Sequence, residues 1–348
     1  MSGKASTVEK ITPIEEREPA NGRLGYERNG RGVIRTAKVP LPNFFLVGAA
    51  KAGTTSLYHY LRSHPQIYAS PIKEPCFFAT DIELAKFSPD YRHDYLPNAH
   101  EYIWGEMSHP VHSAYITKFE DYAGLFRKVR NEKAIGEASV AYLGSQRAAY
   151  EIKARIPDAK IVIILRDPAE RAFSHYLMDR QLGVVLRSFT DELREDLKNP
   201  VKGWGRTRMY IEHGLYFEQV KRFLEVFGSE RVRIYFSKDL REQRSALLQD
   251  LYSFLEVTPE PLPAGDANLN RSRAPRFPRF NYWMHRSGWK RPSSIATIRR
   301  LRSRIAPMLY IPAPKLSETD RAMLIEFFAD DIRKLQDLLD CDLSEWLR

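Results

Sequence analysis

The sequence predicts an α/β fold in which a central, mostly parallel sheet is flanked by helices on both sides. Residues 160–165, KIVIIL, form a continuous apolar and mostly β-branched run, which is typical of a strand buried on both faces. Residues 44–47 form a second apolar run, and a helix-like segment follows each of the two runs. Strand-like segments that alternate with helix-like segments favour parallel pairing.

The elements follow from local patterns. The first strand leads through a glycine-rich loop into a helix at 54–63, and the strand at 160–165 leads into a helix that Gly183 ends. Ser317 and Asp320 form the capping pattern of a last helix. The Ser317 side chain would accept a hydrogen bond from the amide of Asp320, and the Asp320 side chain would accept one from the amide of Ser317. Further segments, in chain order, are an amphipathic helix at 216–227, a strand at 231–237 and a helix at 239–256.

The domain organisation is also predicted from composition. Residues 1–38 mix charges, Gly, Pro and Asn without periodicity, which indicates a flexible tail. The rest, 39–348, is long enough for a single domain with a large core. Within it, residues 86–118 form a loop-rich insertion of the kind that often carries substrate contacts.

Bulk composition argues against several classes of protein. The 348-residue chain is 43% hydrophobic and 28% charged, as expected of a globular protein. It has no apolar run of membrane-spanning length, and its N-terminus lacks the apolar centre of a secretory signal. Cys76 and Cys341 are its two cysteines, too few for a disulfide framework or a zinc site. We therefore expect a cytoplasmic protein.

The first candidate site is the loop that follows the first strand, GAAKAGTTS at 48–56. Glycines there allow close approach of a ligand, and free amides at the helix start attract an anion. The lysine lies two residues before the second glycine, whereas a kinase loop has it directly after that glycine, where this chain has Thr54. A structural turn is the alternative interpretation. The candidate anion-binding residues are Lys51, Ala52, Gly53, Thr54, Thr55 and Ser56.

A second anion site is predicted after the strand at 160–165. Arg166 lies at the carboxyl end of that strand and Ser174 on the following helix, and strand carboxyl ends line the ligand crevice of such sheets. The alternative is a local ion pair of Arg166 with Asp167 or Glu170.

A third candidate is the segment KEPCFF at 73–78. Its Glu74 precedes a proline and an aromatic pair, and a carboxylate in such surroundings suits a general base. A solvated loop glutamate is the alternative. The adjacent Lys73 is a candidate substrate contact.

Together and in this order, the three segments resemble the sulfotransferases that use 3'-phosphoadenylyl sulfate (PAPS). GAAKAGTTSL resembles that family's 5'-phosphosulfate loop, LRDPAERAFSHY its 3'-phosphate element, and KEPCFF the segment of its carbohydrate enzymes that carries a catalytic glutamate. The resemblance covers about residues 40–345, includes GEASVAYL at 136–143, and ends in a segment typical of soluble bacterial members. It implies a P-loop-like three-layer fold and sulfuryl transfer to a hydroxyl or amine of a carbohydrate, lipid or secondary metabolite.

The resemblance also implies roles for single residues. Lys51 would stabilise charge on the bridging oxygen and Glu74 would take the acceptor's proton, without a metal ion. A late basic loop would close over the donor, here through Arg271, Ser272 and Arg273. Glu137 is a candidate acceptor contact, although it could equally hold its loop.

Two departures from the family pattern concern the acceptor and the base. Ala138 replaces the lysine that heparan sulfate enzymes use to contact substrate, which argues against a glycosaminoglycan acceptor. Phenol and steroid enzymes use a histidine base, and neither His59 nor His64 matches that position.

The net charge of +10 is concentrated in one segment. Residues 267–317 contain twelve Lys or Arg and no Asp or Glu. Such a block indicates an anionic partner, which could be a multiply charged cofactor, nucleic acid or a membrane surface, and the arginines beyond the donor loop could also attract an anionic acceptor. Peripheral membrane contact through Arg299, Arg300, Arg302 and Arg304 is one hypothesis, and a solvated basic helix is the other.

Two rival functions remain on this evidence. One is a P-loop kinase for a small metabolite, which would need ATP and a metal ion. The other is a non-enzymatic module that binds nucleic acid or membrane, but no known nucleic-acid motif accompanies the charges. We expect no nucleic-acid partner, and the oligomeric state and the acceptor stay open.

Overall fold

The computed structural model describes residues 39–91, 96, 98–261, 273–287 and 308–348. Pro40–Arg348 forms one compact unit. The predicted tail at 1–38 therefore lies outside the described residues, as do Arg271, Ser272 and the arginines between 299 and 304. The predicted domain boundaries stay predictions.

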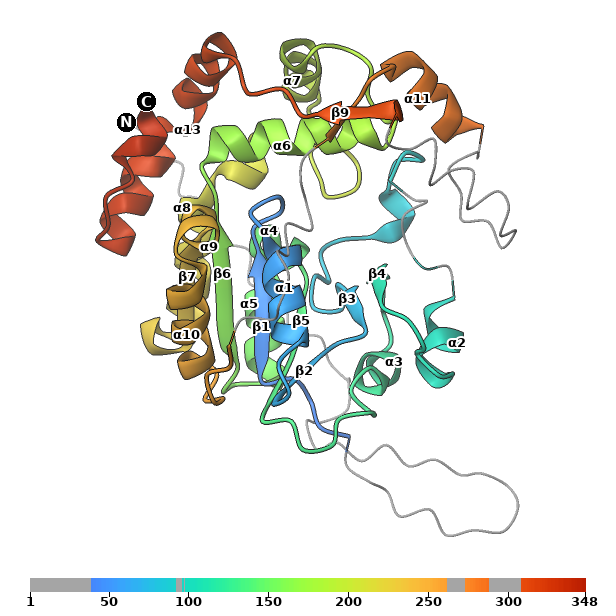
Figure 1. Ribbon diagram of the computed structural model, residues 1–348, viewed down its shortest axis with the longest axis vertical. Coiled ribbons are helices and arrows are strands. Elements are labelled where there is room, and N and C mark those ends of the chain that lie inside the picture. Colours follow the sequence, from blue (N-terminus) through green and yellow to red (C-terminus); the bar gives the residue numbers. More distant parts are fainter. Residues whose placement is uncertain (1–38, 92–95, 97, 262–272, 288–307) are drawn as a thin grey trace, which may run out of the picture. The chain divides into compact units, whose positions relative to one another are not determined.

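A five-stranded sheet forms the centre of this unit, with the strand order β2-β5-β1-β6-β7 (Figure 1). Every neighbouring pair is parallel, and Phe44 in the central strand is in register with Gly136 on one side and Lys160 on the other. The predicted α/β fold class is confirmed. The strands are β1 (Phe44–Gly48), β2 (Ile67–Ala69), β5 (Ala134–Ala138), β6 (Lys160–Leu165) and β7 (Val232–Phe236).

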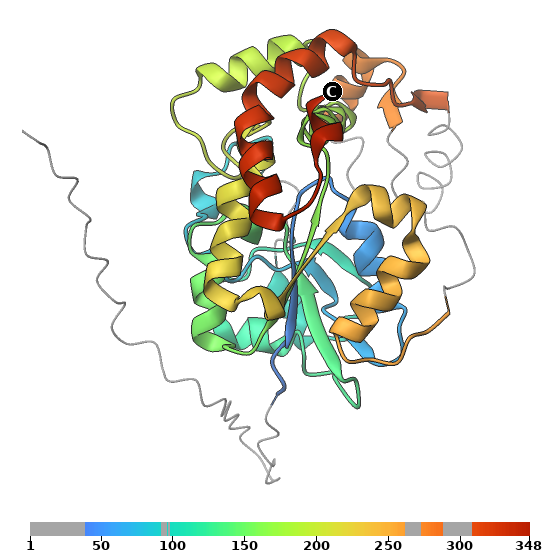
Figure 2. The same cartoon turned by 90° about the vertical axis from the view of Figure 1, so that its left-hand side faces the viewer.

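Helices cover both faces of the sheet, as Figure 2 shows with the sheet seen nearly edge-on. One face carries α1 (Thr54–Arg62), α9 (Ser237–Glu242) and α10 (Arg244–Phe254). The other carries α4 (Ala141–Gly144), α5 (Ala148–Arg155) and α8 (Tyr216–Phe227), and the long α13 (Glu318–Leu339) packs on α8.

The remaining elements lie outside the central sheet and the helices just described. The longest is α6 (Pro168–Gln181), which begins directly after β6. The others, in chain order, are β3 (Ile72–Glu74), α2 (Ala99–Trp104), β4 (Val111–Ser113), α3 (Phe119–Gly124), α7 (Phe189–Lys198), β8 (Arg273–Pro275), α11 (Pro278–Arg286), β9 (Tyr310–Pro312) and short 3-10 turns at Leu84–Lys86, Glu212–Gly214, Ser229–Arg231 and Ser344–Leu347. Strands β3 and β4 pair in parallel, and β8 and β9 pair antiparallel.

Local chemistry explains why the two site-bearing helices begin where they do. Asp167 caps α6 by accepting hydrogen bonds from the amides of Ala169 and Glu170, and Pro168 occupies the first helical position, where no amide is needed. At α1 the capping residue is Gly53, whose backbone is left-handed and whose helix start carries no side-chain cap. The amides of this first turn therefore remain available for a ligand.

Two local predictions differ from the structure. The single helix predicted at 239–256 is divided into α9 and α10 at Gln243, because the chain turns immediately after β7 and α9 already begins at Ser237. At Ser317 the hydroxyl accepts from the amide of Asp320 as predicted, but the Asp320 carboxylate accepts from the hydroxyls of Ser317 and Thr190. The loop-rich insertion contains α2 and β4.

Candidate active site

A cavity of about 650 Å³ opens at the carboxyl edge of the sheet. Loop 49–53 follows β1, Arg166 follows β6 and Ser237 follows β7, so three parallel strands deliver side chains to it. Helix α6 forms another wall with Ser174, His175 and Met178, and Leu182 follows directly after the helix. This is the edge at which open α/β sheets bind ligands.

The glycine-rich loop forms the floor of this cavity. Lys51 adopts a left-handed backbone with φ of 68° and Gly53 another with φ of 108°, so the loop turns sharply before α1 begins. A non-glycine residue in this conformation stores strain, which is often found at ligand sites. The amide of Ala49 donates to the carbonyl of Ile164 at 2.7 Å and fixes the loop to β6. All the predicted residues, from Lys51 to Ser56, line the cavity.

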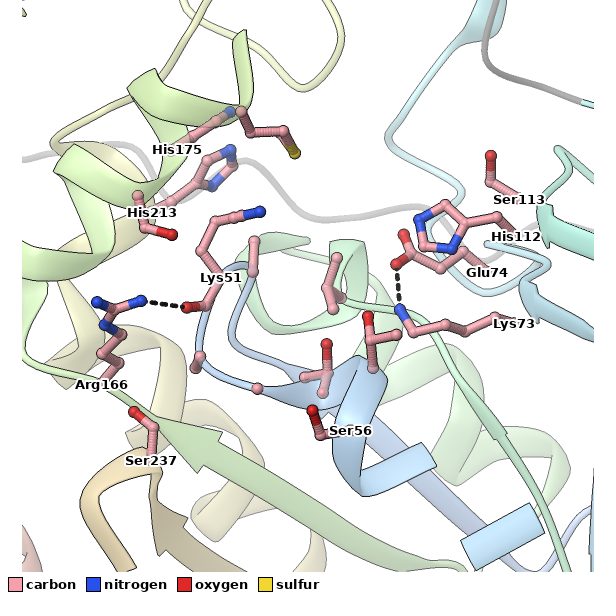
Figure 3. A pocket seen from close by; sticks show the side chains of 18 of the residues that line it. Lys51, Ser56, Lys73, Glu74, His112, Ser113, Arg166, His175, His213 and Ser237 are labelled. Atoms are coloured by element: carbon pink, nitrogen blue, oxygen red, sulfur yellow. Dashed lines mark hydrogen bonds and ion pairs between the residues drawn. The ribbon is translucent and has the colours of Figure 1, made fainter. Parts of the chain in front are cut away.

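The structure brings the second predicted anion site to the same cavity. Arg166 Nη1 donates to the carbonyl oxygen of Lys51 at 3.3 Å, which joins the end of β6 to the loop (Figure 3). Arg166 also pairs with Glu170 at 2.9 Å, so the local ion pair considered above exists as well. Ser174 lies on α6 and lines the cavity. The two predicted anion sites therefore share one space.

The Lys73–Glu74 pair lies across the cavity from Arg166 in Figure 3. Lys73 Nζ donates to Glu74 Oε1 at 2.6 Å, and the exposed fractions of the two side chains are 5% and 13%. Glu74 ends β3 and is in register with Ser113 at the end of β4. The carboxylate is thus held in one direction at the cavity wall, so the alternative of a solvated loop glutamate does not apply.

Among the predicted site residues that the structure describes, Glu137 and Arg273 do not line the cavity. Glu137 is 1% exposed and accepts hydrogen bonds from Tyr122, Ser139 and Tyr142, so it holds β5 to neighbouring segments instead of facing an acceptor. Burial raises its pKa to about 7. Arg273 is exposed on β8 and is absent from the described cavity lining.

The Lys51 side chain lies near three cationic side chains and one buried carboxylate. Burial, with Arg166, Lys73 and Arg171 nearby, lowers the pKa of Lys51 to about 8, while the Asp179 carboxylate opposes this shift. Burial raises the pKa of Asp179 itself to about 7. The cavity is therefore a site where buried cations outnumber nearby anions, as anion binding requires.

Several cavity residues were missed by the sequence analysis. His175 and His213 stack with ring centroids 5.9 Å apart, and burial lowers the pKa of both, so they are neutral at physiological pH. Tyr91 and Arg208 also line the cavity and contact one another. His175 follows Ser174 directly and could have been found as the next residue of the motif. Tyr91, Arg208 and His213 come from loops whose packing no local pattern indicates.

The two histidines considered as bases lie elsewhere. His59 is exposed on α1, and the buried His64 makes a hydrogen bond with the carbonyl of Thr258 at 2.8 Å. Neither is among the described cavity residues. Ala138, the other position that the sequence analysis singled out, is completely buried.

The described part of the chain contains neither a cluster of metal ligands nor a membrane-spanning helix. No three His, Cys, Asp or Glu side chains within 39–91, 96, 98–261, 273–287 and 308–348 gather as a metal site. Over the same ranges, no helix combines the length and apolar character needed to cross a bilayer.

Comparisons with known proteins point to one family. The model of the sulfotransferase family matches residues 42–261. A solved sulfotransferase from Alicyclobacillus acidocaldarius is 30% identical, superposes with a TM-score of 0.62, and covers 89% of this chain and 100% of its own.

Curated relatives are longer proteins that share one part with this chain. The membrane-associated sulfotransferase kil1 of Dictyostelium discoideum is 33% identical over 136 residues, which is 39% of this chain and 22% of that protein. Human bifunctional heparan sulfate N-deacetylase/N-sulfotransferase 2 is 29% identical over 241 residues, which is 68% of this chain and 23% of that protein. The chain thus spans less than a quarter of the length of these two relatives.

Proposed function

The chain belongs to the sulfotransferase family, and we propose that it transfers a sulfuryl group from PAPS to a hydroxyl or amine of a carbohydrate, lipid or secondary-metabolite acceptor. Adenosine 3',5'-bisphosphate would be released. One observation carries this proposal: Arg166 contacts the carbonyl of Lys51, so the two anion sites border a single cavity.

The residues present fit a donor with two separate anionic ends. The uncapped first turn of α1, with Thr55 and Ser56, offers amides and hydroxyls to one end. Arg166 and Ser174 offer a guanidinium and a hydroxyl to the other. The cavity volume of about 650 Å³ lies within the range typical of ligand sites. PAPS would supply the sulfuryl group and a good leaving group.

Lys51 would provide the positive charge where negative charge develops on the leaving side. Its side chain extends into the cavity between Arg166 and the Lys73–Glu74 pair (Figure 3). A fixed cation in such a low-dielectric site stabilises developing charge more than a cation in water would. In a kinase loop the lysine would stand at Thr54. Here the left-handed backbone of Lys51 would instead direct the side chain of this earlier lysine into the cavity.

Glu74 would remove the acceptor's proton. Lys73 holds Glu74 Oε1, which leaves Oε2 as the oxygen for a hydroxyl or amine that enters from the side of His112 and Ser113. We propose that the acceptor half of the cavity is bounded by these residues together with Tyr91, Trp204 and Arg208. Lys73 and Glu74 would then both contact the acceptor, as the sequence analysis expected.

The proposal is tested by incubating the protein with PAPS labelled in its sulfate and a cell extract, and by identifying the labelled product. We expect transfer by the wild type and a loss of about 100-fold or more in Lys51→Ala and in Glu74→Gln. Glu74→Gln should retain affinity for adenosine 3',5'-bisphosphate. Glu225→Gln is the matched control, because this glutamate is exposed on α8. Wild-type transfer by Glu74→Gln would remove Glu74 from the mechanism.

The kinase alternative makes the opposite prediction. It requires ATP, a metal ion and a lysine where this chain has the buried Thr54. Transfer of the γ-phosphate of ATP in the presence of Mg²⁺, with no transfer from PAPS, would favour it over sulfuryl transfer.

A further inference from the structure

Helix α11 presents an aromatic face to solvent. Phe277, Phe280 and Trp283 recur at every third position and are 56%, 46% and 63% exposed. Asn281 and Met284, on the opposite side, are buried. Phe277 directly precedes α11, and Phe280 and Trp283 lie on it. Large aromatic side chains normally pack into a core, so three exposed ones in this short segment indicate a binding surface.

The neighbouring strand pair extends this face. The amide of Arg276 donates to the carbonyl of Leu309, which joins the start of α11 to the segment before β9. Met308 and Ile311 there are 69% and 42% exposed. We call these five side chains the α11–β9 surface. They make up half of the ten large hydrophobic side chains that are exposed in the described part of the chain.

Arginines surround the α11–β9 surface. Arg276, Arg279 and Arg286 are all exposed, and no acidic residue occurs among 273–287 and 308–317. The exposed Leu186 and Leu197 lie in a different setting, since Leu186 precedes α7, Leu197 belongs to it, and this helix carries Asp191, Glu192 and Glu195. These arginines therefore favour an anionic partner for the α11–β9 surface.

The chemistry favours a lipid surface over other anionic partners. Aromatic rings and methionine beside arginines suit the boundary between headgroups and acyl chains, where rings are buried and arginines contact phosphates. A second copy of the chain would bring the same arginines against each other. Nucleic acid would gain little from Met308 and Ile311, which offer neither a hydrogen bond nor a positive charge.

The α11–β9 surface adjoins the proposed active site. Asn281 Nδ2 donates to the carbonyl oxygens of Arg180 and Gln181 at 2.9 and 3.1 Å, which fixes α11 to the end of α6. Helix α6 is a wall of the cavity, and α11 lies beside its end in Figure 1. Arg286 also pairs at 3.5 Å with Asp90, the neighbour of the cavity residue Tyr91.

We propose that the α11–β9 surface docks the protein on an anionic lipid membrane. Docking would place the mouth of the cavity near the interface, and it would favour an acceptor that is itself held in the membrane. This last consequence rests on the proposed sulfuryl transfer, whereas the docking does not.

The test is flotation of the full chain with vesicles. We expect binding to phosphatidylcholine vesicles that contain phosphatidylglycerol, little binding to phosphatidylcholine alone, and release by added salt. The double variant Phe280→Glu/Trp283→Glu should lower the partition coefficient by about tenfold or more. Arg276→Gln/Arg279→Gln should lower the partition coefficient by a similar factor, because each arginine near an anionic surface contributes to binding.

Tyr150→Glu is the matched control, since this ring is 56% exposed on α5, away from α11. All variants replace exposed side chains, and unchanged melting temperatures would verify their folding. Equal binding by the wild type and the double variant would overturn the proposal, as would no binding to anionic vesicles. A dimer in sedimentation that the double variant abolishes, without vesicle binding, would assign the surface to self-association instead. Failure here leaves transfer to soluble acceptors intact, so the two proposals fail separately.

Discussion

Lys51 combines two features that are uncommon for a lysine. Its backbone is left-handed, with φ of 68°, and its side chain is half-buried in the wall of the cavity. Burial lowers its pKa to about 8, and the Asp179 carboxylate prevents a larger shift. Lys51 is therefore charged at neutral pH but loses its proton at slightly higher pH. The pH dependence of activity should report the loss of this charge.

We predict that kcat/KM falls as pH rises through about 8. Deprotonation of Lys51 removes the positive charge from the free enzyme, and kcat/KM reports the pKa values of the free enzyme. In Asp179→Asn the fall should begin at lower pH, because the carboxylate that raises the pKa of Lys51 is gone. The measurement is kcat/KM as a function of pH, with PAPS below its saturating concentration.

Asp158→Asn is the control for this prediction, since Asp158 lies at the surface with an 84% exposed side chain. Its profile should match that of the wild type. Identical profiles for wild type and Asp179→Asn, or a flat profile well above pH 8, would contradict the assignment of this limb to Lys51.

At the scale of elements, β5 is held to the segment that follows β3. Glu137 in β5 accepts from the hydroxyls of Tyr142 and Ser139, and these hydroxyls in turn accept from the amides of Phe78 and Cys76. The buried carboxylate thus fixes the chain just after Glu74. Its role is to position the segment that carries the proposed base.

We predict that Glu137→Ala lowers the free energy of unfolding by about 3 kcal/mol, because three hydroxyls would lose their buried acceptor. Glu137→Gln keeps an oxygen for Tyr122 and Tyr142 and should be destabilised much less. The measurement is urea unfolding followed by circular dichroism.

The same pair of variants makes a prediction about pH. The pKa of Glu137 is raised from 4.5 to about 7 in the folded state, so the folded protein binds a proton that the unfolded chain releases. Its contribution is complete below about pH 4.5 and is lost as pH rises through 7. Glu137→Gln should therefore show a smaller decline of stability between pH 5 and 8. An unchanged decline would mean that this carboxylate is ionised throughout.

At the scale of the whole molecule, the cavity joins elements that are far apart in sequence. The loop after β1 and helix α6 are separated by more than one hundred residues, and the contact of Arg166 with Lys51 unites them. A ligand that reaches both should stabilise the fold more than a ligand that reaches one, since binding to the native state alone raises stability with affinity.

We therefore predict that adenosine 3',5'-bisphosphate raises the melting temperature more than 5'-AMP, 3'-AMP or ATP with Mg²⁺ at equal concentration. In Ser174→Ala the advantage over 5'-AMP should shrink, because the hydroxyl offered to the second phosphate is removed. Ser253→Ala, at an exposed position on α10, is the control. Greater stabilisation by ATP with Mg²⁺ would favour the kinase alternative.

Much of the fold could be predicted because its signals are local. The apolar run at β6 forms a strand in any setting that buries both faces, and α8 occupies the predicted range Tyr216–Phe227, which Gly228 ends. The division between α9 and α10 could not be predicted, because the apolar pattern continues across Gln243 while the chain turns there.

The candidate site likewise contains residues that the sequence predicts and residues that it does not. Lys51, Glu74, Arg166 and Ser174 lie in motifs where residue type and spacing indicate the chemistry, and all four line one cavity. Glu137 and Arg273 were predicted from neighbouring motifs, but whether such side chains face a ligand depends on packing. Tyr91, Arg208 and His213 have no local signal at all.

The sequence by itself predicted the parallel α/β architecture, because the periodicity of apolar residues is local, and its resemblance to known motifs predicted the family and two anion-binding segments. Only the tertiary structure decided that Arg166 reaches the carbonyl of Lys51, that Glu137 is an interior carboxylate, and that the aromatic side chains of α11 face solvent. The physical reason is that these outcomes depend on which distant surfaces bury one another, and burial is a property of the packed chain.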